Sequence, residues 1–224
     1  MFSESNTSIP AKGMGMIPLQ LASTLSSEEL ILNESVLSIE ANEVLTALGN
    51  RYQADTILIA TRVDNLPMPF LGQSKGKKSV TCLYFSADQA PYPQKLIALN
   101  ANPNKLINNI AVMSNVSRHY APVDKSLISI SIIEDCDVFS ATELELKVKD
   151  ELKFWYPDCM DWEHLKTYKI PYALPENKHV ANDVNPLTLR LNDSTFICGD
   201  HLLNGSINAA MKSGRLAAEA ILSL

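Results

Sequence analysis

The sequence predicts a mixed α+β and α/β protein in which a largely antiparallel sheet carries packed helices. The main observation is a run of apolar segments joined by short connections that contain prolines, an order typical of antiparallel strands. These segments are 79–85, 95–100, 109–114 and 126–133. Two further observations are a change to a helical period at 142–155 and a strand followed by a helix at the end of the chain.

The composition is that of a globular protein and excludes several classes of function. Of the 224 residues, 46% are hydrophobic and 20% are charged, and the net charge is −6. An acidic chain lacks the basic field that phosphate contacts need, so we expect no nucleic-acid binding. Because no apolar run has the length of a transmembrane segment and residues 1–4 lack a basic start, we expect a cytoplasmic protein.

The four cysteines are widely scattered, which favours buried free thiols in a reducing compartment over a disulfide framework. Cys198 and His201 are three residues apart, a spacing found in metal sites. No second pair of ligands completes such a site, so we expect no metal ion.

The first residues predict a short helix. Gly13 and Gly15 imitate a dinucleotide-binding fingerprint, but no strand precedes them and Pro18 stands where the third glycine belongs. Proline is well suited to the first turn of a helix, so we expect a helix that begins near Pro18 and runs to Leu25.

Several strands should follow this helix. The segment 30–39 reads as a short apolar strand, an asparagine and a second apolar stretch. Gly49-Asn50 is a favoured tight turn between alternating segments, so we expect a hairpin over 44–52. Residues 55–61 then predict a buried strand.

The segment 142–155 predicts an amphipathic helix on the sheet. Leu144, Val148, Leu152 and Trp155 share one helical stripe, and Trp155 is therefore expected in the core. After it, 167–175 predicts a strand that leads into a proline-ended loop.

The end of the chain predicts an anion-binding site. Residues 195–200 read as a short buried strand ending in Gly199-Asp200, and Gly205 allows a sharp bend into a helix capped by Ser206. Free amides and the positive end of the helix dipole would lie beside the strand end. The helix has a face of small residues, at Ala209, Ala210, Ser213, Gly214, Ala217 and Ala218.

This last segment resembles the closing FAD-binding motif of the flavin-containing amine oxidase and phytoene desaturase superfamily. The resemblance implies that Asp200 meets the ribityl or pyrophosphate part of FAD and that the helix N-terminus faces the flavin end. The stretch 30–39 resembles the family segment in which a valine backbone contacts the adenine end of FAD, here Val36. The implied cofactor-binding residues are Val36, Gly199, Asp200, Gly205, Ser206, Ile207 and Asn208.

The resemblance also implies a division of the chain. Residues 1–61 would be part of an FAD-binding region, 62–190 the substrate-binding domain and 191–224 the closing FAD-binding strand and helix. In the family segment that 167–175 resembles, the chain passes along the substrate cavity. Tyr168 and Tyr172 are therefore candidates for its walls, although packed aromatic residues are an equal alternative.

The implied function is that of an FAD-dependent oxidoreductase, of the amine oxidase or desaturase type, which transfers a hydride from an apolar or amine substrate to flavin. The glycine-rich fingerprint of the family is absent, so the chain corresponds to a C-terminal part, and an N-terminal Rossmann partner chain or a homo-oligomer would complete it. The alternative is a non-catalytic binding or interaction module that binds no FAD by itself. The sequence indicates no catalytic residue, because no histidine has a nucleophile at a readable spacing.

Overall fold

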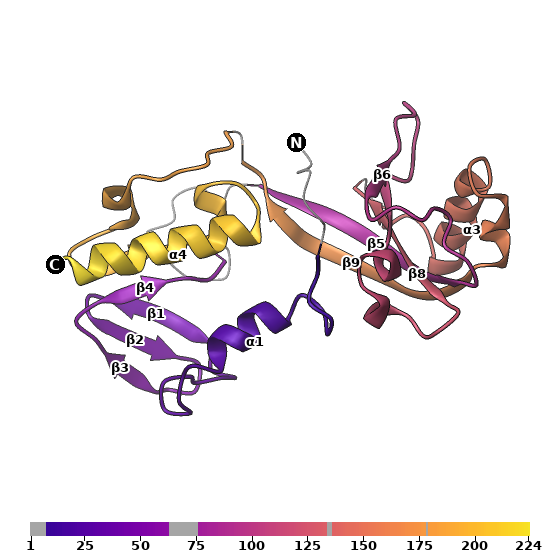
Figure 1. Cartoon of the computed structure of the whole chain (residues 1–224). Coiled ribbons are helices and arrows are strands. Elements are labelled where there is room, and N and C mark those ends of the chain that lie inside the picture. The colour runs from indigo at the N-terminus through magenta and orange to yellow at the C-terminus, as the bar shows by residue number, and fades with distance from the viewer. Residues whose placement is uncertain (1–7, 63–75, 134–135, 178) are drawn as a thin grey trace. The chain divides into compact units, whose positions relative to one another are not determined.

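The computed structural model describes residues 8–62, 76–133, 136–177 and 179–224. They form two compact units (Figure 1). The first unit comprises Met1–Ser26 and Ser79–Ala173, and the second unit comprises Ser27–Lys78 and Leu174–Leu224. The assignment of 1–61, 62–190 and 191–224 to cofactor and substrate binding remains a prediction.

The first unit is built on a five-stranded sheet with the strand order β6-β7-β8-β5-β9. The β6–β7, β7–β8 and β8–β5 pairs are antiparallel, which confirms the expected antiparallel sheet. The strands are β5 (Lys77–Ala87), β6 (Ile97–Leu99), β7 (Asn109–Val112), β8 (Ser126–Ile132) and β9 (Glu163–Pro175).

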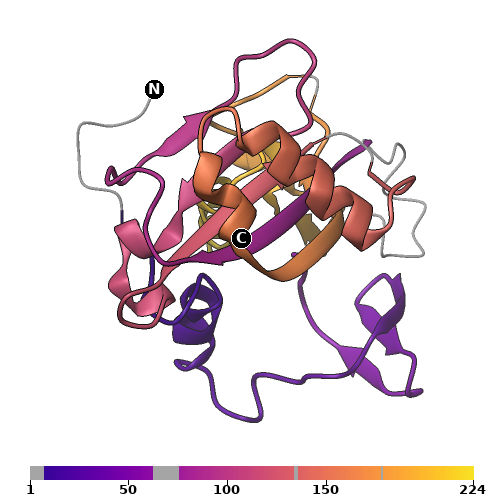
Figure 2. The same cartoon turned by 90° about the vertical axis from the view of Figure 1, so that its right-hand side faces the viewer.

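Helix α3 (Ala141–Leu152) lies across this sheet (Figure 2). Ser140 caps it through a capping box with Glu143, which satisfies free amides of the first turn. The stripe of Leu144, Val148 and Leu152 is fully buried, as its spacing predicts. It packs against a sheet face made of Leu83, Phe85, Ile110, Val112, Ile128, Ile130 and Ile132.

The expectation that Trp155 lies in the core is wrong. The helix ends at Leu152, and the Trp155 amide donates to the Leu152 carbonyl at 2.9 Å, so the helical stripe does not continue to position 155. The Trp155 side chain is 38% exposed. Trp162 is buried in its place, against Phe85 and Tyr156.

Short helices complete the first unit. The helix α1 (Met16–Ala22) carries Pro18 in its first turn, as expected, and has no buried residue. The Tyr120 hydroxyl donates to the Pro10 carbonyl at 2.8 Å and so fixes the segment before α1. The other short helices are α2 (Met113–Val116), η3 (Arg118–Tyr120) and η4 (Pro157–Asp161).

The second unit contains a three-stranded antiparallel sheet with the order β1-β2-β3. Its strands are β1 (Val36–Glu40), β2 (Glu43–Thr46) and β3 (Arg51–Gln53). The β2–β3 pair confirms the hairpin expected around Gly49, which adopts a φ of 85°. Residues 30–32 form no strand, contrary to expectation, because no described strand pairs with them.

The second unit also contains a parallel pair, β4 (Ile57–Ile59) beside β10 (Thr195–Ile197). The long helix α4 (Ile207–Leu222) packs on this pair, and two short helices flank β10, η5 (Pro186–Leu189) and η6 (Asp200–Leu202). Ile39, Ile57, Ile59 and Ile197 form a core between the two sheets. The whole is a mixed α/β fold with antiparallel sheets, as the sequence predicts.

Candidate functional site

The candidate site begins with two buried strands that are distant in sequence. Ile57 pairs with Thr195 and Ile59 with Ile197, so the strand after the hairpin lies beside the strand that leads to Gly199. The Ile57 amide donates to the Ser194 carbonyl at 2.8 Å, and the Cys198 amide donates to the Ile59 carbonyl at 2.9 Å. These hydrogen bonds fix the register of β10 relative to β4 and so fix the position of the end of β10.

Helix α4 approaches this strand end through a narrow stripe of small residues. Ala209, Ser213 and Ala217, four residues apart, are buried. Ala210 and Ala218 are exposed, so the packing face is narrower than the sequence pattern suggested. A Cβ atom at Gly214 would lie 4.0 Å from the Cys198 sulfur, an ordinary contact distance. The close contact therefore depends mainly on the stripe at 209, 213 and 217.

The turn between β10 and η6 needs a glycine. Gly199 has a φ of 157°, and a Cβ atom there would lie 2.4 Å from Nδ1 of His201. Asp200 follows at once as the first residue of η6, and its carbonyl accepts from the Leu203 amide at 3.1 Å. The sharp turn brings the Asp200 carboxylate to the end of the strand.

A second close approach leads into α4. A Cβ atom at Gly205 would lie 3.0 Å from Cδ2 of Leu174 and 3.1 Å from Cδ of Pro175. The Ser206 hydroxyl accepts from the Ala209 amide at 3.1 Å, which confirms Ser206 as the N-cap, and donates to Oδ1 of Asn204 at 2.6 Å.

The first turn of α4 is open to solvent. The side chains of Ile207 and Asn208 are exposed. The Ala209 amide is already bonded to Ser206, whereas the amides of Ile207 and Asn208 precede the first hydrogen bond within the helix. These amides and the dipole of a sixteen-residue helix favour an anion. The arrangement therefore fits the phosphate-bearing part of a nucleotide.

Val36 belongs to the same unit. It is the first residue of β1 and packs against the core formed by Ile39, Ile57, Ile59 and Ile197. The structure thus connects Val36 to the strand that carries Gly199 through one shared core. Contact of any of these residues with FAD remains a prediction.

A glutamate that the sequence reasoning did not single out holds the start of β1. The Glu34 carboxylate accepts from Oγ1 of Thr46 at 2.7 Å, from Nδ2 of Asn50 at 2.7 Å and from the Tyr52 hydroxyl at 3.0 Å. The hydrogen bonds from Thr46 and Asn50 lower the pKa of Glu34, and the bond to Glu34 raises the pKa of Tyr52. Only the folded hairpin brings these four residues together.

A lysine of α4 holds the segment before β10. Nζ of Lys212 donates to the Asn182 carbonyl at 2.8 Å and lies 3.1 Å from Oδ1 of Asp183. The hydrogen bond from Lys212 lowers the pKa of the Asp183 carboxyl. Asn204 donates to the Ala181 carbonyl at 3.1 Å, so the loop before α4 is tied to the same segment.

The first unit presents a different group of side chains on the sheet face opposite α3. Tyr84 and Tyr168 meet edge to face, with ring centroids 5.9 Å apart. Beside them the Cys82 sulfur and the Ser129 hydroxyl are 3.3 Å apart, and burial raises the pKa of Tyr84. Tyr168 is half exposed and so available to a ligand, whereas Tyr172 is half-buried. Their place in a substrate cavity remains a prediction.

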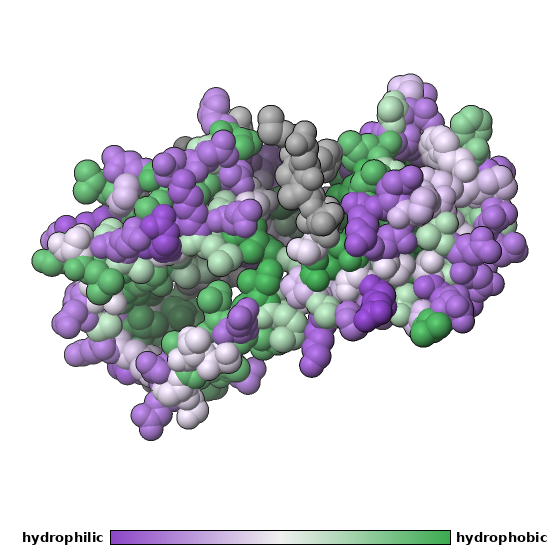
Figure 3. Space-filling view, in the orientation of Figure 1, coloured by the Kyte–Doolittle hydropathy of each residue, from purple (hydrophilic) through white to green (hydrophobic). Residues whose placement is uncertain are grey.

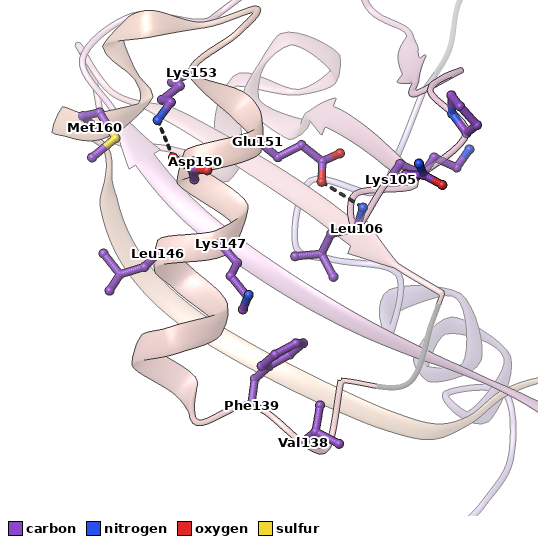
Figure 4. Close-up of a pocket in the computed structure, with 12 residues that line it drawn as sticks. Lys105, Leu106, Val138, Phe139, Leu146, Lys147, Asp150, Glu151, Lys153 and Met160 are labelled. Atoms are coloured by element: carbon purple, nitrogen blue, oxygen red, sulfur yellow. Dashed lines mark hydrogen bonds and ion pairs between the residues drawn. The ribbon is translucent and has the colours of Figure 1, made fainter.

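An open hollow of about 1200 Å³ lies between α3 and the loop 103–106 (Figure 4). Its polar groups are engaged locally. The Glu151 carboxylate accepts from the Leu106 amide at 2.8 Å and from Asn100 at 2.6 Å, and Lys153 pairs with Asp150. Glu151 therefore holds the loop on α3.

No group of three or more histidine, cysteine or acidic side chains within the described ranges is arranged to hold a metal ion. The Cys198 thiol is buried, and burial raises its pKa. Among the described residues, no helix is both long enough and apolar enough to cross a membrane.

Fold and site together define a class. A buried parallel strand that turns through a glycine into a capped helix is the arrangement with which α/β proteins bind nucleotide phosphates. The model of one family, described as flavin-containing amine oxidoreductase, matches residues 1–222. The chain belongs to the flavin-containing amine oxidoreductase family.

Solved structures share the fold at low sequence identity. Reduced UDP-galactopyranose mutase superposes with a TM-score of 0.71 at 12% identity, over 95% of this chain and 52% of the other. A triple mutant of putrescine oxidase with redesigned cofactor binding superposes with a TM-score of 0.69 at 12% identity, over 96% and 54%.

An oxidoreductase from Methanosarcina mazei has a TM-score of 0.59 at 13% identity, over 83% of this chain and 48% of the other. The chain thus spans about half the length of these structures. Comparison with curated proteins finds no match.

Proposed function

We propose that this chain is part of an FAD-dependent oxidoreductase in which the second unit contributes to the FAD site. The observation that carries the proposal is the turn from β10 through Gly199-Asp200 to the capped start of α4. Family membership supports flavin as the cofactor. The exposed first turn of α4 fits a phosphate group, and the Asp200 carboxylate fits a hydroxyl of the ribityl chain.

The bound flavin would supply the redox chemistry by accepting a hydride from the substrate. The residues of this chain would bind and orient. Asp200 would accept hydrogen bonds from FAD, the first-turn amides of α4 would hold the pyrophosphate or the flavin end, and the Val36 backbone would contact the adenine end. The sheet face with Tyr84 and Tyr168 would position an apolar or amine substrate, and its aromatic edges would exclude water.

The parallel pair β4–β10 supports a further part of the proposal, a nucleotide-binding half supplied from outside these 224 residues. Parallel sheets are normally covered on both faces and contain more than two strands. Ile57 and Ile59 bond toward β10, so the peptide groups of Leu58 point to the other edge, where no described strand pairs. Figure 3 shows a hydrophobic hollow between α4 and the β1–β3 sheet of this unit. We propose that the completing half covers it.

Buried cysteines that form no disulfide support a reducing compartment, and we propose the cytoplasm as the site of action. The second candidate function is a binding module without FAD. The observation that favours a binding module is the exposure of the apolar residues 30–32, which could bind a partner protein instead of completing a cofactor site.

The deciding experiment is a titration of the protein, as isolated from its source, with FAD. We expect flavin fluorescence to be quenched and the flavin spectrum to shift on binding, and the bound flavin to be bleached anaerobically by an amine substrate. A protein that binds no FAD supports the binding module instead.

The matched variant test uses Asp200→Ala. Loss of a hydrogen bond to a charged group weakens binding by about tenfold or more, so the FAD dissociation constant should rise by that factor. Asp193→Ala is the control, because the Asp193 side chain is fully exposed. Equal affinities of Asp200→Ala and the unmodified protein would refute the role of Asp200.

A further inference from the structure

Ser213 makes contacts that its place in a helix does not require. Its side chain is fully buried at the centre of the small stripe of α4. Its hydroxyl oxygen accepts from the Gly199 amide at 2.9 Å and lies 3.1 Å from the Gly199 carbonyl and 3.0 Å from the Ala210 carbonyl. A hydroxyl has one proton, so it donates to one of these two carbonyls at a time.

Packing alone does not account for this serine. Ala209 and Ala217, four residues before and after it on the same stripe, are buried without any hydroxyl. A serine in or next to a helix often bonds back to a carbonyl of the preceding turn, as the C-cap residue Ser223 does with Ala220 at 2.8 Å. Ser213 can make that bond to Ala210, and in addition its oxygen accepts from the Gly199 amide, fourteen residues away, and lies within donating distance of the Gly199 carbonyl.

Gly199 is the residue where the direction of the chain changes. It follows β10 by two positions, has a φ of 157° and directly precedes Asp200. A glycine has many accessible conformations, so a turn built on it stays in one of them only where other groups hold it. The Gly199 carbonyl accepts from the Leu202 amide at 3.3 Å, and the Ser213 hydroxyl lies within hydrogen-bond distance of both peptide groups of Gly199.

We infer that Ser213 is a positioning residue that holds Gly199, and through it the Asp200 carboxylate, in register with the N-terminus of α4. The bond accepted from the Gly199 amide fixes the distance of the turn from the helix, and when the hydroxyl proton goes to the Gly199 carbonyl it also fixes the rotation of the turn. The part of this inference that concerns FAD rests on the proposed function. Ser213 is buried and would act on FAD only through Gly199 and Asp200.

The first test needs no cofactor. In Ser213→Ala the Gly199 amide loses its acceptor, and its hydrogen exchange, followed by NMR, should accelerate about tenfold, as loss of one hydrogen bond implies. Ser223→Ala removes the hydroxyl of the exposed C-cap residue of α4, which bonds to the carbonyl of Ala220 in the same helix, and should leave exchange at Gly199 unchanged. If exchange at Gly199 is the same in Ser213→Ala and the unmodified chain, the inference is wrong.

The second test is a double-mutant cycle on FAD affinity. Introduced alone, Ser213→Ala should raise the FAD dissociation constant about tenfold. Introduced together with Asp200→Ala, it should have little further effect, because Ser213 acts on FAD only through Asp200. A purely structural role would give additive effects, and additivity would overturn the inference.

The two tests separate the two proposals. A protein that binds no FAD refutes the proposed function, while exchange at Gly199 still decides whether Ser213 holds the turn. Strong FAD binding with no coupling between positions 213 and 200 refutes the positioning role and leaves the proposed function intact.

Discussion

At the scale of single residues, the site depends on positions where the backbone comes close to its neighbours. Gly199 and Gly205 each lie where a Cβ atom would come within 3.1 Å of another residue. Gly13 and Gly15, whose spacing imitates a fingerprint, have no atom within 4 Å of a Cβ position. Gly199 and Gly205 therefore have a steric role that Gly13 and Gly15 lack.

The change Gly205→Ala tests this role. The new methyl group would press on Leu174 and Pro175, and overpacking of this kind costs about 1 kcal/mol or more. Chemical denaturation should show a lower free energy of unfolding for Gly205→Ala. Gly15→Ala is the matched control. Its new methyl group would have no atom within 4 Å, and Gly15 has a negative φ that alanine adopts easily, so the variant should be neutral or slightly stabilising. Equal losses in both variants would contradict the steric argument.

At the scale of elements, the β1–β3 sheet is held at its start by the Glu34 carboxylate. Its hydrogen bonds to Thr46, Asn50 and Tyr52 stabilise the charged form, so the pKa of Glu34 is lowered in the folded state. A group of this kind adds stability above its unfolded pKa, and that contribution is lost as the pH falls through the folded pKa.

The change Glu34→Gln should therefore reduce the pH dependence of stability in acid. Between about pH 6 and about pH 3, the unmodified chain should lose more free energy of unfolding than Glu34→Gln does. Denaturation at the two pH values measures the difference. The exposed Glu28, changed to Gln, is the control and should behave as the unmodified chain. Identical acid losses in Glu34→Gln and the unmodified chain would show that the network adds no stability.

At the scale of the whole molecule, the second unit exposes an apolar segment that an isolated chain would tend to cover. Leu30, Ile31 and Leu32 are 37%, 53% and 69% exposed and belong to no strand. Contiguous exposed apolar surface favours association. The purified 224-residue chain should therefore self-associate as its concentration rises.

Sedimentation velocity tests this expectation with the double variant Ile31→Ser and Leu32→Ser, which should shift the equilibrium toward the monomer by about tenfold. Val123→Ser is the control, because Val123 is 88% exposed and stands in the first unit. An unmodified chain that stays monomeric over the whole concentration range would contradict the prediction.

Local patterns were sufficient for the elements whose residues interact with near neighbours. The stripe of Leu144, Val148 and Leu152, the turn at Gly49 and the cap at Ser206 each act within a few residues, so the sequence displays them. The prediction that Trp155 continues the buried stripe was wrong, because periodicity does not show where a helix ends. The strand predicted at residues 30–32 was wrong for a related reason. A strand needs a neighbouring strand to pair with, and its own sequence does not show whether the fold supplies one.

The sequence by itself determined the family, the antiparallel sheet with its helix, and the strand, turn and capped helix at residues 195–224. Only the tertiary structure decided how Ser213 meets Gly199, how Glu34 meets the hairpin and how Lys212 meets residues 182–183. These contacts join positions between 12 and 30 residues apart, and many side chains could serve in them. Their pairing is set by the folded geometry, because a hydrogen bond forms only where the fold brings donor and acceptor within about 3 Å.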